Sequence, residues 1–351
     1  MDILETNLSA KQKEVIAKVQ NAHKEKLDVL IVTGEAGSGK TTLISHIFNK
    51  PGIFKDTYAA ALTGRAANVL RDKGINEAMT IQSLVSGRPK FNWLSKLKFL
   101  QKLTFTKTVI NNENNKIFIF DEASMITDSL DKNSSWQNRD GLTQLERIEK
   151  VVNVSGGYQL ILMVGDKNQL PPPVENTDRE HTYSNALSKT YWEKKGYRNV
   201  EAMDLGTTHR QDEDTSLLKF AREIIDVGTE AVPIVDDETI SLVGVDNAYA
   251  LHTFLKYYEK DPLQVKWIVS SNYGVAKNTD TIRKELFQIE PTTLINKDSL
   301  TNLNIQKDEP ILVSKNNTAQ SIDIFNGDIL KIKKIKSPQS IPITIKKITD
   351  S

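Results

Sequence analysis

The sequence predicts an α/β protein in which a parallel β-sheet is covered by helices. Short apolar runs, rich in β-branched residues, alternate with segments whose apolar residues recur at helical spacing. A glycine-rich turn joins the first such run to a helix, and a pair of acids directly follows a later run. This alternation is typical of parallel sheets, because their strands are buried on both faces and joined by helices.

The elements follow one another in a regular order. A helix is expected from Leu8 to Lys26, because Val15, Ile16, Val19 and Ala22 have helical spacing. Either Asn7 or Ser9 is a suitable cap for it. A buried strand is expected next at 27–33 and a helix at 41–49. Further short apolar runs predict buried strands at 58–62, 116–120, 159–164 and 266–270.

Three segments depart from this pattern. Residues from about 86 to 115 are basic, aromatic and asparagine-rich, and indicate an insertion, whereas 128–139 is a polar loop. From about Asn296 onward the pattern changes to short β-like pieces, with the hairpin signal Asn326-Gly327. The lysine-rich segment 331–347 alternates with isoleucines, which predicts strands with one solvated face.

Composition limits the classes of protein. A chain of 351 residues has room for about two domains. The 46 Lys and Arg nearly balance the 45 Asp and Glu, so a nucleic acid would have to bind in a local groove. The absence of cysteine excludes disulfides and Cys-ligated metals. The chain shows neither a signal peptide nor an apolar run of about 18 residues, so a cytoplasmic protein without membrane association is expected.

A phosphate-binding loop is predicted between the first strand and the second helix. The segment from Gly34 to Thr41 has the pattern G-x-x-x-x-G-K-[ST], and its strand–loop–helix context disfavours a chance glycine-rich turn. Lys40 would reach the β- and γ-phosphates, and the Thr41 hydroxyl would ligate Mg²⁺. The residues expected to bind nucleotide here are Gly34, Glu35, Ala36, Gly37, Ser38, Gly39, Lys40, Thr41 and Thr42.

An acid pair supplies the expected partner of this loop. Asp121 and Glu122 directly follow a predicted buried strand. In P-loop enzymes such an Asp holds Mg²⁺, and the Glu orients and deprotonates the attacking water. Alone, such a pair is usually part of a solvated loop, but together with the glycine-rich loop it predicts an ATPase or GTPase. No Asn-Lys-x-Asp motif follows a strand, which favours ATP.

Further motifs resemble those of superfamily 1B DNA helicases of the RecD/Dda type, in the same order along the chain. The matching segments are Leu8–Gln12, Ala60–Ala67, Thr80–Leu84, Asp121–Met125, Gly165–Pro172, Leu205–Gln211 and Ser270–Asn272 with Asn278 and Arg283, followed by Lys315–Asn317 and Phe325–Asp328. The resemblance implies a RecA-like ATP-binding domain at 1–204, with the insertion at 86–115 as a pin-like segment. It also implies a partial second RecA-like domain at 205–298 and the start of an inserted SH3-like β-rich domain at 299–351.

The resemblance also implies roles for individual residues. Gln12 would pair with adenine. Gln169 would sense the γ-phosphate, and Arg210 would reach it from the second domain. With Lys40, Asp121 and Glu122, these last two form the expected catalytic set. The residues expected to contact DNA are Thr63, Gly64, Arg65, Thr80, Gln82, Pro171 and Asn272, although the family more often has histidine at position 82.

Some of these segments have simpler interpretations. Taken alone, Thr63-Gly64-Arg65 favours a helix cap followed by a surface arginine. The aromatic residues Phe91, Trp93, Phe99 and Phe105 of the insertion could form a small separate core with a solvated basic face instead of a strand-splitting pin.

The function implied is that of an ATP- and Mg²⁺-dependent helicase that moves 5′-to-3′ on single-stranded DNA, with recombination, repair or replication proteins as further partners. Two later family motifs, one of which carries a second γ-phosphate arginine, do not occur in the sequence. The resemblance therefore implies a truncated chain that binds ATP but hydrolyses it poorly. The alternative is an ATP- and DNA-binding subunit of a RecD-like exonuclease complex. The segment Gln169-Leu-Pro-Pro disfavours a small P-loop kinase.

Overall fold

The computed structural model divides the chain into two units. It describes residues 8–52, 54–86, 88–90, 104–106, 113–128, 141–154, 156–170, 183–206, 216–227, 247–261, 265–287, 307–312, 329–335 and 343–347. The first unit comprises Met1–Glu213 and Lys315–Gly327, and the second comprises Asp214–Ser314 and Asp328–Ser351. The domain boundaries expected at 204/205 and 298/299 stay predictions, and each unit is described by itself.

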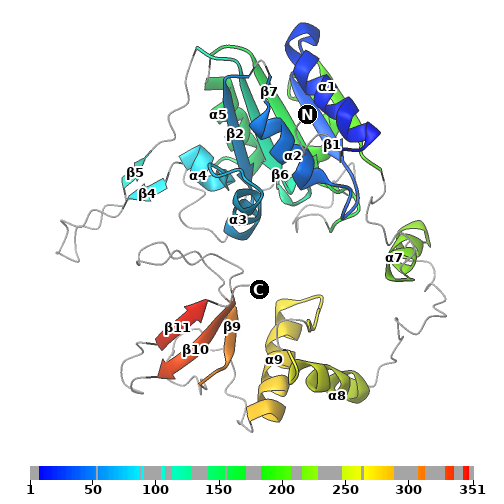
Figure 1. Cartoon of the computed structure of the whole chain (residues 1–351), viewed down its shortest axis with the longest axis vertical. Helices are drawn as coiled ribbons and strands as arrows, with labels where there is room; N and C mark the ends of the chain where they lie inside the picture. The colour runs from blue at the N-terminus through cyan, green and yellow to red at the C-terminus, as the bar shows by residue number, and fades with distance from the viewer. Residues whose placement is uncertain are drawn as a thin grey trace. The chain divides into compact units, whose positions relative to one another are not determined.

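A parallel sheet forms the centre of the first unit (Figure 1). Among the described residues it has six strands in the order β3-β2-β6-β7-β1-β8. Neighbouring strands all run in the same direction, so their carboxyl ends lie at one edge. The strands are β1 (Val29–Thr33), β2 (Asp56–Ala61), β3 (Met79–Thr80), β6 (Lys116–Asp121), β7 (Gln159–Gly165) and β8 (Val200–Asp204).

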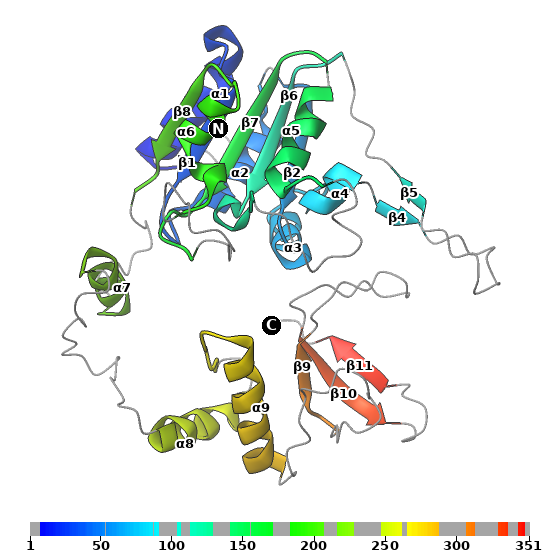
Figure 2. The same cartoon turned by 180° about the vertical axis from the view of Figure 1, so that it is seen from behind.

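Helices cover both faces of this sheet (Figures 1 and 2). Leu30 and Val32 of β1 pack on one face, and Val29 and Ile31 pack on the other. Because both faces are covered, the strand is apolar along its whole length, as the sequence predicted. The first face holds α1 (Ala10–Glu25), α2 (Lys40–Asn49) and α3 (Gly64–Asp72), and the second holds α4 (Ile81–Ser86), α5 (Gln144–Val154) and α6 (Lys189–Lys194) with the 3₁₀ turns η1 (Ala123–Met125) and η2 (Asn185–Leu187).

The local structure of α1 follows from its sequence. The Ser9 side chain accepts a hydrogen bond from the Gln12 N–H, and the Gln12 side chain accepts one from the Ser9 N–H, which is a capping box. Val15, Ile16 and Val19 form the buried face, and the helix ends where Lys26 turns into the left-handed region at φ 53°. The predicted helix at 8–26 is therefore confirmed.

Most of the predicted strands are confirmed, and one is wrong. The runs at 27–33, 58–62, 116–120 and 159–164 correspond to β1, β2, β6 and β7. The run at 266–270 forms no strand within the described residues. Its side chains alternate in exposure, and Ile268 is 90% exposed. A β-rich run becomes a strand only where a neighbouring chain completes its hydrogen bonds, and the described residues supply none here.

The insertion contains a short antiparallel pair. β4 (Arg88–Lys90) pairs with β5 (Thr104–Thr106), with Pro89 opposite Phe105. The pairing is compatible with a pin, which stays a prediction. Phe91, Trp93 and Phe99 lie outside the described residues, as does the polar loop from 129 onward.

The second unit contains α7 (Ser216–Val227), α8 (Asn247–Tyr258), α9 (Asn272–Phe287) and a three-stranded antiparallel sheet within the described residues. Its strands β9 (Pro310–Leu312), β10 (Ile329–Ile335) and β11 (Ile343–Lys347) confirm the strands predicted near the end of the chain. The turn residues Asn326 and Gly327 lie outside the described residues. An ion pair at 2.6 Å joins the buried side chains of Arg283 on α9 and Glu309.

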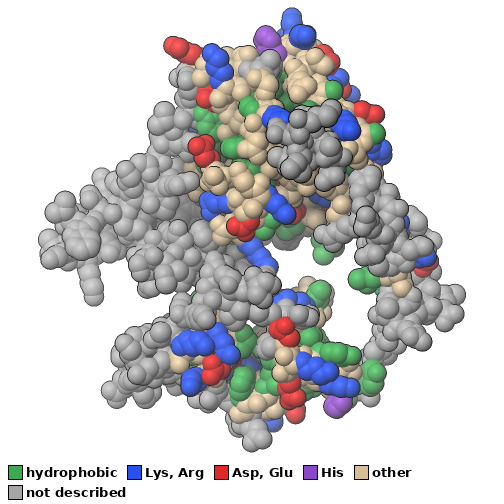
Figure 3. Space-filling view, in the orientation of Figure 1, with side chains coloured by type: hydrophobic (Ala, Val, Ile, Leu, Met, Phe, Trp, Pro, Cys, Tyr) green, Lys and Arg blue, Asp and Glu red, His purple; other side chains and the backbone are tan. Residues whose placement is uncertain are grey.

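The surface of the first unit carries both signs of charge. On the face shown in Figure 3, acidic and basic side chains are interspersed. This agrees with the near balance of 46 basic and 45 acidic residues in the sequence. Across the described part of the chain, no helix combines the length and the apolar character that a bilayer crossing requires.

Candidate active site

Three neighbouring strands bring the predicted nucleotide-binding residues together. β7 lies between β1 and β6, so the glycine-rich loop after β1 and the acids at the end of β6 are two strand spacings apart, roughly 10 Å. The Gly34 N–H donates to the Gly165 carbonyl at 3.2 Å, which joins the start of the loop to the end of β7. Gln169 follows β7 and therefore lies on the edge where the other two segments end.

The loop at 34–39 has the geometry of an anion cradle. Gly37 and Gly39 have φ of 87° and 82°, a region that residues with a Cβ rarely adopt. α2 begins directly after Gly39 and has no side-chain cap, so its first N–H groups can bind an anion. The Lys40 Nζ donates to the Gly34 and Glu35 carbonyls at 2.7 and 2.9 Å. Its ammonium group is thus held against the backbone of the first two loop residues.

The loop also contains a buried hydroxyl. The Ser38 side chain is buried, and its Oγ makes no hydrogen bond with any residue that the structure describes. An unpaired buried hydroxyl costs free energy until a donor or acceptor reaches it. Phosphate oxygens accept such bonds, so this observation fits a loop built to hold a nucleotide.

Gln12 supports the loop from α1. Its Nε2 donates to the Gly39 carbonyl at 3.1 Å, while its Oε1 accepts from the Ser9 N–H at 2.8 Å. An amide has two donor hydrogens and an oxygen with two lone pairs, so each end keeps capacity for one further bond. The side chain is only 4% exposed. The expected role of Gln12 in pairing with adenine stays a prediction, and its contact with the loop is an additional finding.

Asp121 is a buried carboxylate at the end of β6. It is 7% exposed, and its Oδ1 accepts a hydrogen bond from the Glu122 N–H at 2.9 Å. Desolvation raises the pKa of Asp121 to about 6, and the positive charge of Lys40 opposes this shift. A carboxylate that loses hydration without gaining a close cation is well suited to a metal ion.

The donor set around Asp121 fits Mg²⁺. The described residues contain no cluster of three or more His, Cys, Asp or Glu that could hold a metal by themselves. A cation at Asp121 would therefore take its other ligands from a hydroxyl, phosphate oxygens and water, which is the arrangement Mg²⁺ favours. Thr41, in the first turn of α2, supplies the hydroxyl that the sequence predicts for this role.

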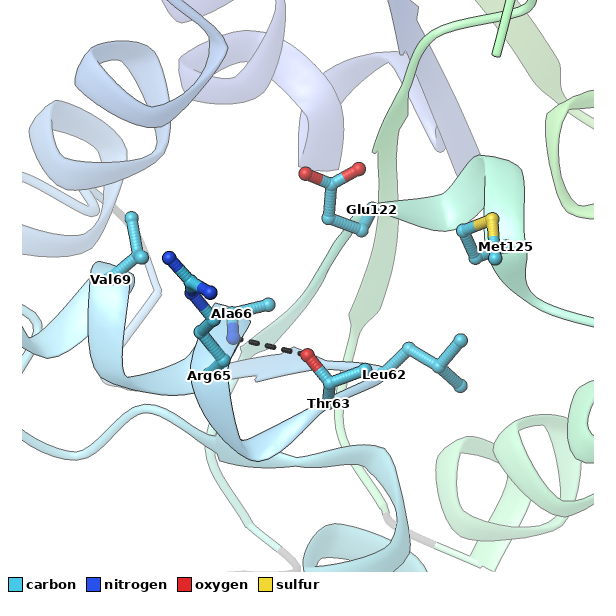
Figure 4. A pocket seen from close by; sticks show the side chains of 7 residues that line it. All are labelled: Leu62, Thr63, Arg65, Ala66, Val69, Glu122 and Met125. Atoms are coloured by element: carbon cyan, nitrogen blue, oxygen red, sulfur yellow. Dashed lines mark hydrogen bonds between the residues drawn. The ribbon is translucent and has the colours of Figure 1, made fainter. Parts of the chain in front are cut away.

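Glu122 lines a cavity together with residues that follow β2. Its backbone is left-handed, with φ 55°, which is uncommon for a residue other than glycine. The cavity has a volume of about 330 Å³, and Arg65 reaches into it from the start of α3 (Figure 4). Its other walls are mainly apolar, and the lining residues are Leu62, Thr63, Arg65, Ala66, Val69, Glu122 and Met125.

The predicted DNA-contacting residues of the first unit lie after β2 and β3. The Thr63 Oγ1 accepts from the Ala66 N–H at 3.1 Å and so caps α3, as the simpler interpretation suggested (Figure 4). Gly64 is the first residue of that helix and is buried. The Thr80 hydroxyl accepts from the Ser83 N–H at 3.1 Å at the start of α4, where Gln82 is exposed. Capping leaves the hydroxyl hydrogen of Thr63 able to donate.

The sequence reasoning missed Ser124. Its Oγ donates to the Gln169 Oε1 at 2.9 Å, so the turn after the acid pair contacts the predicted γ-phosphate sensor directly. A hydroxyl two residues beyond Glu122 was the available signal, but its partner follows another strand, 45 residues along the chain. Only the strand order brings the two together.

Other predicted site residues are not placed at this edge. Arg210 and Pro171 lie outside the described residues. Asn272 begins α9 in the second unit, and its side chain is not described. Arg283, which belongs to one of the matching segments, is buried in the second unit and forms an ion pair with Glu309.

Comparisons with known proteins agree with this geometry. Residues 16–175 match the family model described as an AAA domain. A crystal structure of Pif1 helicase from Bacteroides, in complex with ADP-AlF3 and ssDNA, superposes with a TM-score of 0.52 at 17% identity. The alignment covers 97% of this chain and 72% of that one. The fold is that of the Pif1 helicases.

A second Pif1 structure, from a study of unwinding at forked dsDNA, gives the same TM-score of 0.52 at 16% identity, covering 97% of this chain and 74% of that one. No curated protein matches the chain. The predicted α/β architecture with a RecA-like parallel sheet is thus confirmed, since it is the fold of these two structures. Membership of superfamily 1B, and of the RecD/Dda type within it, stays a prediction.

Proposed function

We propose that this chain is the motor core of an ATP-dependent DNA helicase that couples ATP hydrolysis to movement along single-stranded DNA. The observation that carries the proposal is the strand order, because β7 brings Gln169 between the Lys40 loop and the Asp121 carboxylate. An ATP-driven motor needs a phosphate-binding loop, a metal-binding acid and a γ-phosphate sensor close to one another. The Bacteroides Pif1 structure of similar fold contains both ADP-AlF3 and ssDNA, which supports the proposal.

The nucleotide would bind at the start of α2. The Lys40 ammonium, now bonded to two loop carbonyls at 2.7 and 2.9 Å, would exchange them for β- and γ-phosphate oxygens. Thr41 and Asp121 would hold Mg²⁺, which neutralises charge on the transferred phosphoryl group when bound. Glu122 would accept a proton from the attacking water, and Gln169 would donate to the γ-phosphate.

Single-stranded DNA would cross the edge where β2 and β3 end. The N–H groups at the start of α3, together with Thr63, Gly64 and Arg65, suit a phosphate backbone, and Thr80 and Gln82 extend the surface. Backbone contacts of this kind are independent of sequence, as a translocating motor requires. The 5′-to-3′ direction, the roles of Arg210, Pro171 and Asn272, and the cytoplasmic location are parts of the proposal that rest on the sequence motifs.

The experiment measures Mg-ATP binding and hydrolysis by the purified chain, with and without single-stranded DNA. We expect the chain to bind Mg-ATP and Lys40→Ala to abolish binding, whereas Lys13→Ala, at an exposed site on α1, serves as a matched control and leaves it intact. Hydrolysis by these 351 residues is expected to be slow, because an arginine at the γ-phosphate is typically worth about 10³–10⁵ in rate and the second such motif is absent. Equal nucleotide binding by the Lys40→Ala variant and the unmodified chain would contradict the proposal.

A further inference from the structure

The contact between Ser124 and Gln169 joins two loops of the proposed nucleotide site. Ser124 lies in η1, three residues after Asp121, and is 1% exposed. Its Oγ donates to the Gln169 Oε1 at 2.9 Å. Gln169 itself is only half-buried, so one end of its amide is fixed while the rest can face the nucleotide edge.

The two loops are also packed tightly at their backbones. A Cβ placed on Gly165 would come within 2.9 Å of the Ser124 backbone nitrogen and 3.1 Å of a Leu187 methyl group. Glycine at position 165 therefore permits the close approach of η1 to the end of β7. Because the backbones on both sides are held, the hydroxyl of Ser124 has a defined position relative to Gln169.

The direction of this hydrogen bond fixes the orientation of the amide. A carboxamide has an acceptor oxygen at one end and two N–H donors at the other. When Oε1 accepts from Ser124, Nε2 faces away from η1 and can donate to a phosphate oxygen. In the reverse orientation, Oε1 would face the anionic phosphate and repel it.

We propose that Ser124 is a positioning residue that holds the Gln169 amide with its N–H donors toward the γ-phosphate. This inference rests on the proposed function, because it assigns the partner of a residue in that same site. Ser124 does not touch the nucleotide. Ser124 orients the Gln169 amide, and that amide distinguishes ATP from ADP by its contact with the γ-phosphate. Ser124 also ties the sensor to the turn that carries Asp121 and Glu122.

The test compares the affinities for ADP and for ADP with aluminium fluoride, both with Mg²⁺, measured by titration calorimetry. We expect Ser124→Ala to leave ADP binding within about twofold but to reduce the preference for the fluoride complex about fivefold, the value of one lost hydrogen bond. Gln169→Ala is expected to reduce that preference about tenfold, and adding Ser124→Ala to it should cause no further loss. Ser124→Thr retains the hydroxyl and should restore most of the preference.

The Gln169→Glu variant tests the acceptor end of the amide separately from its donor end. A carboxylate still accepts from Ser124 but has no N–H donors, so this variant should lose the preference as Gln169→Ala does. Thermal unfolding of each variant shows whether it is folded. If Ser124→Ala is not, Ser124→Cys replaces it, because a thiol is only a weak hydrogen-bond donor. Equal weakening of ADP and the fluoride complex in Ser124→Ala, or additive losses in the double variant, would overturn the inference. Failure of the unmodified chain to bind either ligand would overturn the proposed function instead.

Discussion

At the scale of single residues, the site contains groups that destabilise the folded protein but suit the proposed chemistry. Asp121 is a buried carboxylate, and Glu122 has a left-handed backbone. Such features cost folding free energy and are retained where chemistry requires them. The sequence predicted that both acids come at the end of an apolar strand, and the structure has them there. The sequence could not show that Asp121 is desolvated or that Glu122 lines a cavity with Arg65, because both facts depend on chain segments distant in sequence.

The raised pKa of Asp121 leads to a prediction about stability. Its pKa is about 6 in the folded protein and 3.8 in the reference state, so the folded state holds the proton more tightly. The nucleotide-free protein should therefore lose stability from this group as pH rises from about 4 to 6, with no further loss above that range. Asp121→Asn keeps the acceptor for the Glu122 N–H and removes the charge. It should raise the free energy of unfolding at pH 7 by up to about 3 kcal/mol.

The same substitution should abolish Mg²⁺-dependent ATP binding. Urea unfolding at pH 4 and pH 7, without nucleotide, provides the measurement, and the stability difference between Asp121→Asn and the unmodified chain should disappear at the lower pH. A variant that is less stable than the unmodified chain at pH 7 would show that the carboxylate is not an electrostatic cost in the folded state.

At the scale of elements, the glycine-rich loop depends on both its own backbone and α1. Gly39 has φ 82° and lies against the Gln12 amide, so an added Cβ would both strain the backbone and collide with that side chain. Gly74 has a similar φ of 89°, but nothing lies within 4 Å of its added Cβ. The two glycines therefore form a matched pair. Substitution of Gly74 tests backbone strain alone, whereas substitution of Gly39 tests strain together with the collision with Gln12.

We expect Gly74→Ala to lower the free energy of unfolding by about 1 kcal/mol and to leave Mg-ATP binding unchanged. Gly39→Ala should lower it by more and should also eliminate Mg-ATP binding, because Gln12 and the loop must separate. Chemical unfolding and titration calorimetry on both variants provide the comparison. Intact nucleotide binding by Gly39→Ala would mean that the loop tolerates displacement of Gln12.

Elements were predictable from sequence where burial was continuous. β1, β6 and β7 each contain a continuous apolar run, and each was predicted within a few residues. β8 was missed because Val200–Asp204 contains Glu201 and Asp204, which an edge strand can direct into solvent. The strand order was beyond sequence reasoning, since hydrogen-bonded neighbours such as β6 and β7 are set by tertiary packing. For that reason the Ser124–Gln169 contact could not be predicted either.

At the scale of the whole molecule, the described residues of the proposed nucleotide site all belong to the first unit, and the Arg283–Glu309 pair belongs to the second. Both members of this pair are buried, at 8% exposure each. Removing one partner of a buried ion pair leaves the other charge without compensation, which typically costs about 3–5 kcal/mol. Arg283→Ala should therefore destabilise the second unit selectively.

The expected result is loss of amide exchange protection in α9 and β9, with Mg-ATP affinity within about twofold of the unmodified chain. Hydrogen exchange read by mass spectrometry, with nucleotide titration in parallel, tests this. Replacing the exposed Lys277 on the same helix by alanine is the control, and it should change neither quantity. A large drop in ATP affinity in Arg283→Ala would show that nucleotide binding requires an intact second unit.

The central place of β7 has a mechanical consequence. A strand hydrogen-bonded on both sides, to β1 and to β6, cannot slide without breaking two ladders of bonds at once. Release of the γ-phosphate would therefore not shift β7 relative to β1 and β6. Any stroke that the motor makes must start in the short segment beyond Gly165, where the pairing of β7 with β1 and β6 has ended.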